Sequence, residues 1–66
     1  MNVGKSLKMA LAKRDMNQTQ LAEKMKCTSI WINRLANSQS ASMGTVVLLA
    51  DALDMKASEF LALGED

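Results

Sequence analysis

The chain has 66 residues, which is enough for one small domain with a modest core. It has no histidine and one cysteine, so an internal disulfide, a histidine–cysteine metal site and a histidine-based catalytic triad are excluded. Residues 1–50 carry seven basic and two acidic side chains, whereas residues 51–66 carry one basic and five acidic. This division fits a basic body facing a polyanion, or a solvated surface with accidental clustering.

The hydrophobic pattern has the period of an α-helix from the N-terminus onward. Val3, Leu7, Ala10 and Leu11 recur at the spacing of one helix face, and this first helix should end near Asp15. Because proline is absent and alanine, leucine, methionine and lysine are frequent, the composition also favours helices over strands.

Polar residues that favour helix starts divide the rest of the chain. Asn17 can accept from the free amides of a second helix, and Gln20 can reach back to it. Thr28 and Ser42 can cap a third and a fourth helix in the same way, and a last short helix carries Phe60. The sequence therefore predicts about five short helices around one core.

The second and third helices, within residues 18–35, are joined by only about three residues. So tight a turn between steeply crossing helices needs a small side chain at their contact, and Ala22 is placed there. We expect Cys27, Ile32 and Leu35 to fill the wedge between the two helices. Such a pair holds its second helix clear of the domain, so that the outer face can enter a DNA major groove.

These residues resemble the Cro/cI-type (lambda-repressor-like, XRE) helix-turn-helix regulators of phages and bacteria. The resemblance covers nearly the whole chain and implies a compact, all-α, five-helix domain over residues 1–66, ordered from about residue 2 to 63. The matching residues are Asn17–Met25, Cys27, Thr28, Ile32, Leu35, Leu49–Leu53, Phe60 and Leu61.

The chain departs from the family pattern at a few positions. Lys26 stands where the family usually has glycine, and a positive φ there would cost about 1 kcal/mol. Leu11 and Ala36 stand where the family often pairs arginine with glutamate, and an apolar pair can replace such an ion pair without loss.

The outward side of the third helix is the predicted base-reading surface. Arg34 can pair bidentately with guanine, Asn33 and Ser29 can bond to base edges, and Ile30 can pack on thymine methyl groups. Arg34 has the alternative of binding phosphate only, and Ile30 that of belonging to the core.

Other polar residues are candidates for the DNA backbone. The resemblance implies a phosphate contact for Gln18, which the free amides at that helix start also suit. Trp31 either lies along a sugar-phosphate strand or covers the first helix as peripheral core. The loop after the third helix either donates to a phosphate or is an ordinary loop. The full set of backbone candidates is Gln18, Thr28, Trp31, Asn37, Ser38 and Gln39.

The resemblance further implies a Cro-like transcriptional repressor that binds a near-palindromic operator as a homodimer. Its dimer interface is expected around Met55, Lys56, Ala57 and Glu59. The alternatives are an antitoxin or controller-type regulator, and a helical protein-interaction module that has lost DNA binding.

The sequence favours a binding protein over an enzyme. Its three glycines are scattered and form no phosphate-binding loop, and most carboxylates lie in the C-terminal segment. We expect no cofactor, metal or small-molecule ligand. No apolar run approaches the ~18 residues of a membrane span, and we expect a cytoplasmic, nucleoid-associated protein of a bacterial cell.

Overall fold

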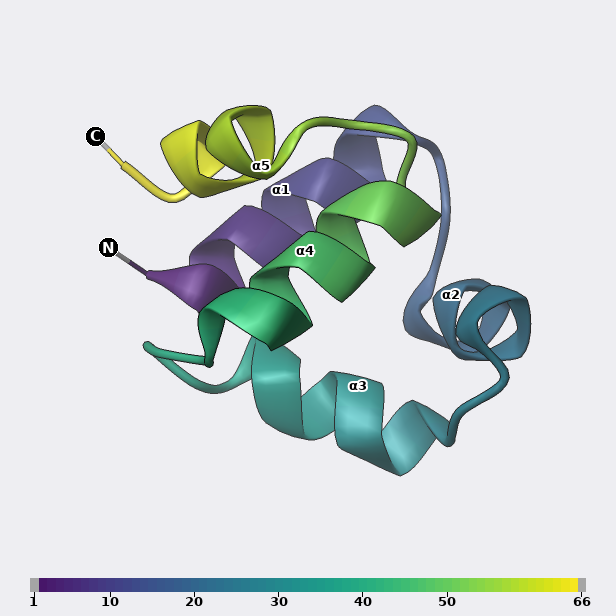
Figure 1. Ribbon diagram of the computed structural model, residues 1–66. Helices are drawn as coiled ribbons and strands as arrows, with labels where there is room; N and C mark the ends of the chain where they lie inside the picture. Colours follow the sequence, from purple (N-terminus) through teal and green to yellow (C-terminus); the bar gives the residue numbers. More distant parts are fainter. Residues whose placement is uncertain (1, 66) are drawn as a thin grey trace.

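The computed structural model describes residues 2–65, which form five α-helices and no strand (Figure 1). This confirms the predicted all-α, five-helix architecture. The predicted domain also includes residues 1 and 66, which lie outside the described residues. Within residues 2–65 no helix is long and apolar enough to cross a membrane. The helices are α1 (Val3–Lys13), α2 (Gln18–Met25), α3 (Ser29–Ala36), α4 (Met43–Ala52) and α5 (Ala57–Leu63).

The predicted caps are present at the starts of α2, α3 and α4. Asn17 Oδ1 accepts from the amide of Gln20 at 2.8 Å, and Gln20 Oε1 accepts from the amide of Asn17 at 2.9 Å. Thr28 Oγ1 accepts from the amide of Trp31 at 3.2 Å, and Ser42 Oγ caps α4 at the same distance. These bonds satisfy first-turn amides that have no acceptor within the helix, and so they fix where each helix begins.

Three helices are followed, within two positions of their last residue, by a residue with left-handed backbone, and none of these residues is glycine. The residues are Asp15 (φ 55°), Lys26 (φ 57°) and Asp54 (φ 56°). Aspartate tolerates this region better than lysine does, so the strain expected at Lys26 is present. The closing bonds run from Met16 N to Leu11 O (2.9 Å), from Cys27 N to Ala22 O (2.9 Å) and from Met55 N to Ala50 O (3.0 Å).

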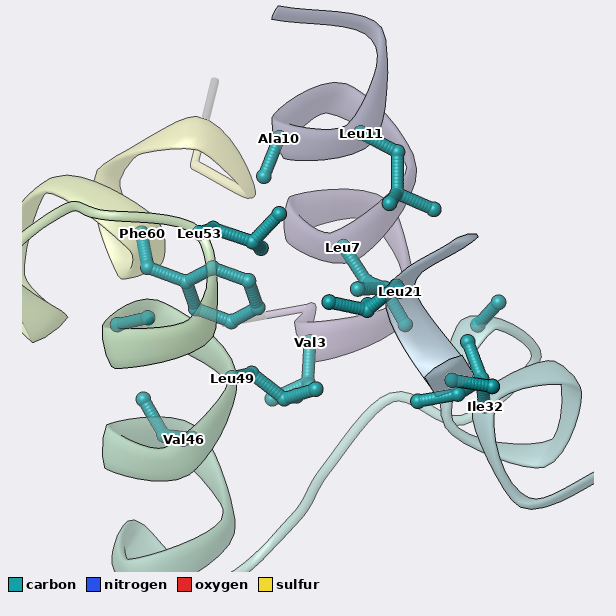
Figure 2. Packing of buried hydrophobic residues seen from close by; sticks show 13 residues of the cluster. Val3, Leu7, Ala10, Leu11, Leu21, Ile32, Val46, Leu49, Leu53 and Phe60 are labelled. Atoms are coloured by element: carbon teal, nitrogen blue, oxygen red, sulfur yellow. The ribbon is translucent and has the colours of Figure 1, made fainter. Parts of the chain in front are cut away.

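The core draws side chains from all five helices. Figure 2 shows Phe60 of α5 beside Leu53 of α4, and Val3 of α1 next to Leu49 of α4. The predicted stripe of α1 is buried, and α2 and α3 add Leu21 and Ile32. The buried hydrophobic residues are Val3, Leu7, Ala10, Leu11, Leu21, Ala22, Ile32, Ala36, Val46, Leu49, Ala50, Leu53 and Phe60.

A close backbone contact fixes the end of α3 against the start of α1. The amide of Gly4 donates to Ser38 O at 2.7 Å, and that of Val3 donates to Gln39 O at 3.2 Å. A Cβ on Gly4 would lie 2.5 Å from Ala36 O and 2.6 Å from Ser38 O, so only glycine fits here. This contact sets the position of α3 relative to the core.

Part of the basic charge of the N-terminal half serves the fold. Arg14 donates from Nε to Leu53 O (2.8 Å) and from Nη2 to Asp54 O (2.9 Å), so it satisfies carbonyls at the end of α4. Lys24 lies 3.5 Å from the carboxylate of Asp54. The charge count alone assigned both cations to a basic body, whereas the structure places them on the C-terminal end of α4.

Candidate nucleic-acid interface

The helix pair α2–α3 has the geometry that the sequence predicted. Three residues join the helices, and the left-handed conformation of Lys26 makes the turn tight. Ala22 and Ile32 are buried, while Cys27 and Leu35 are half-buried and pack against the core. In Figure 1, α3 lies along the lower edge of the molecule, with the other helices above it. One side of α3 is therefore held by the core and the other is left open.

All four predicted base-reading side chains lie on the open side of α3. Ser29, Asn33 and Arg34 are exposed, and Ile30 is 70% exposed. The alternative that Ile30 belongs to the core is therefore wrong. The opposite side of α3 is anchored by Ile32 at 0% exposure. No part of residues 2–65 covers the four side chains, which was the geometric condition for their predicted role.

A polar network joins α3 to the first turn of α2. Asn33 Nδ2 donates to Gln18 Oε1 at 3.2 Å. Asn37 Nδ2 donates to the carbonyl of Asn33 at 3.0 Å and lies 3.3 Å from its side-chain oxygen. The sequence alone did not predict these hydrogen bonds, although the four-residue spacing of Asn33 and Asn37 places them on one helix face.

The backbone candidates fall into two groups. Thr28, Asn37 and Gln39 are exposed, and Gln18 is half-buried at the start of α2 beside the open face of α3. Ser38 is engaged in its own loop, because its hydroxyl donates to Ser40 O at 2.7 Å.

The structure bears on the two alternatives for Trp31, a contact with the DNA backbone or peripheral core. Its side chain is half-buried and packs against the core. This arrangement agrees with peripheral core, the second of the two alternatives, in which Trp31 covers the first helix. Trp31 directly follows Ile30 in the chain and is partly exposed. Its contact with a sugar-phosphate strand stays a prediction.

Basic side chains gather beside the C-terminal end of α3. Lys5 and Lys8 of α1 line a hollow of about 350 Å³ together with Asn37 and Gln39. The hollow brings α1 cations next to loop residues that were expected to donate to phosphate. Positive charge at this place attracts a polyanion irrespective of its sequence.

The sequence profile of the Cro/C1-type HTH DNA-binding domain matches residues 6–66. The chain belongs to this family. A Cro/C1-type HTH domain is a DNA-binding domain, so DNA is the ligand class for this chain. Comparisons with curated proteins and with solved structures gave no match.

The predicted dimer residues lie in the turn between α4 and α5 and in the first turn of α5. Met55 and Ala57 are half-buried and pack against the core of the Cro/C1-type domain. Lys56 and Glu59 are exposed, and the amide of Lys56 donates to Glu59 Oε1 at 3.3 Å. Their role between two copies stays a prediction.

Proposed function

We propose that this Cro/C1-type domain is a sequence-specific transcriptional repressor that binds double-stranded DNA with α3 in the major groove. The observation that carries the proposal is the open side of α3. It presents a guanidinium, a carboxamide, a hydroxyl and an aliphatic side chain on one short helix, while Ile32 holds the other side in the core. A helix with one anchored side and one open polar side fits the width of the major groove.

Each of these side chains suits a different contact with a base. Arg34 supplies the forked donor that matches the two acceptors of guanine, and Ile30 supplies an apolar surface for a thymine methyl group. Asn33 is held at one side by Gln18, and this bond restricts its rotamers before DNA arrives. Holding a side chain in place lowers the entropy that binding costs.

Contacts with phosphates would fix the orientation of α3 in the groove. Gln18 and Thr28 stand at the starts of α2 and α3, where free amides attract phosphate oxygens. Asn37 and Gln39 stand at the other end of α3, next to Lys8. Backbone contacts at both ends of a reading helix set its register without adding sequence preference.

Repression would follow from occupancy of promoter DNA by two copies. A single domain of this size makes few contacts, and two copies on a near-palindromic site would double them, with their α3 helices ~34 Å apart. Such a repressor needs no cofactor, small-molecule ligand or catalytic step, and it would act on bacterial DNA in the cytoplasm. A protein-interaction module has less support, because Trp31 packs against the core.

Binding to a pool of random duplexes, followed by selection of the bound ones, tests this function. We expect salt-sensitive binding and a selected near-palindromic motif. Ile30→Glu should abolish binding, because it sets a carboxylate against the duplex, while Ala12→Glu adds the same charge on α1 and should lower affinity only modestly. Absence of binding at low salt, or equal loss in both variants, would refute the proposed role of α3.

A further inference from the structure

Helix α4 exposes a cluster of large hydrophobic side chains. Met43 is 60% exposed, Val47 is 49% exposed and Leu48 is 58% exposed. The neighbouring Val46, by contrast, is buried in the core. Another large exposed hydrophobic residue, Ile30, lies on the surface assigned to DNA. The cluster on α4 has no role in that assignment.

The exposed side of α4 is apolar over most of its length. The helix has Val46, Leu49 and Ala50 on its buried side, and Asp51 is its single charged residue. A helix at a protein surface normally turns a charged or polar side to water. A helix that is apolar on both sides is usually covered by protein on both sides.

Gly44 lies on the exposed side of α4, in the first turn of the helix. Spacings of three, four and seven residues place it on one face with Val47, Leu48 and Asp51. A Cβ added to Gly44 would meet only the Ser42 hydroxyl, at 4.0 Å, so nothing in the described chain requires glycine there. Glycine weakens an exposed helix relative to alanine, but it lets the backbone of a second helix approach closely.

We propose that this side of α4, formed by Met43, Gly44, Val47, Leu48 and Asp51, packs against the same side of a second copy, with the two α4 helices antiparallel. Charge complementarity selects this partner and this direction. The last turn of α4 has no basic side chain, and its first turn has no acidic one. In the antiparallel pair Asp51 lies near Gly44 of the other copy, where first-turn amides favour a carboxylate.

This arrangement deepens the proposed function, because it names the surface that joins the two copies on DNA. In Figure 1, α4 crosses the front of the molecule while α3 lies along its lower edge. A two-fold axis that lies in the contact plane and is perpendicular to α4 would therefore leave the α3 helices of both copies on the same side of the dimer. The predicted residues Met55–Glu59 follow the end of α4 that approaches the start of α4 in the other copy.

The contact is small, and this sets its strength. Stable dimers usually bury about 800 Å² on each partner, and one face of a ten-residue helix provides less. We therefore expect a weak dimer in solution, which DNA strengthens by holding both copies on one site.

Sedimentation velocity without DNA tests the interface, at concentrations from about 10 µM to about 1 mM, where weak dimers dissociate. The wild-type chain should shift from monomer to dimer across this range. Val47→Glu should weaken the dimer at least about tenfold, whereas the matched Met9→Glu, which changes a 44% exposed methionine on α1, should not. Leu48→Glu serves as a second interface variant, and far-UV circular dichroism checks that each variant is folded.

Cross-linking tests the antiparallel direction. In a Cys27→Ser background, Leu48→Cys should form a disulfide-linked dimer on mild oxidation, because residue 48 lies near the two-fold axis, while Met9→Cys should not. A wild-type chain that stays monomeric at about 1 mM, an unchanged dimer in both glutamate variants at positions 47 and 48, or equal cross-linking at positions 9 and 48 would overturn the proposal. Loss of DNA binding with an intact dimer would instead remove the proposed function and leave the interface standing.

Discussion

Asn33 of the reading helix is tied to Gln18 of the preceding helix by a hydrogen bond of 3.2 Å between their side-chain amides. The bond connects a residue expected to read a base with one expected to hold a phosphate. The oxygen of Gln18 is occupied by Asn33, and its amide nitrogen is the group suited to donate to DNA. Each residue thus helps to orient the other at the edge of the duplex.

Replacement of Gln18 by alanine should weaken DNA binding on all sequences, roughly three- to tenfold, because a phosphate contact carries no sequence information. The selected site should lose somewhat more, because Asn33 also loses the hydrogen bond that holds its side chain. Fluorescence anisotropy on the selected site and on random duplexes measures this. Thr19→Ala, an exposed change on the same helix, is the control. A loss confined to the selected site would contradict the backbone role of Gln18.

Replacement of Arg34 by alanine should cost roughly 1–3 kcal/mol of binding free energy on the selected site and relax the preference at one base pair. The reason is the loss of a bidentate pair with guanine. Binding to a set of single-base variants of the site measures both effects, with Lys13→Ala as a control for the loss of one positive charge. If affinity instead falls equally on every sequence, Arg34 binds phosphate and reads no base.

Replacement of Lys26 by glycine should stabilise the domain by about 0.5–1 kcal/mol. Lys26 has φ 57°, and a left-handed residue with a Cβ carries a penalty that glycine avoids, offset in part by the greater entropy of glycine in the unfolded chain. Urea unfolding measures the change. Lys26→Ala keeps the Cβ and should bring no gain, so equal stability of the glycine and alanine variants would argue against backbone strain.

Replacement of Gly4 by alanine should destabilise the domain by roughly 2 kcal/mol or more, because the new Cβ overlaps carbonyl oxygens that cannot move without displacing the end of α3. DNA binding should fall with it. Gly44→Ala is the matched control: its Cβ has room, so it should stabilise the monomer by up to ~1 kcal/mol in dilute solution. Thermal unfolding of both variants measures the contrast, and a Gly4 variant as stable as the wild type would show that the contact yields easily.

The sequence by itself determined where the helices begin and which side of α1 is buried. Asn17, Thr28 and Ser42 act within one turn of their own positions, and the stripe of α1 follows from helical period alone. The open side of α3 was also predictable, since a short turn and a small Ala22 leave few ways to pack the pair. These features depend on neighbours in the chain, so a linear pattern records them.

Only the tertiary structure decided the contacts between residues far apart in the chain. Arg14 lies on the end of α4, Gly4 lies against the carbonyls after α3, and Asn33 bonds to Gln18. Val46 is buried while Val47 is exposed, although both are the same residue type on one helix. Which arc of an apolar helix turns inward, and which donor meets which carbonyl, depends on how the helices pack in three dimensions.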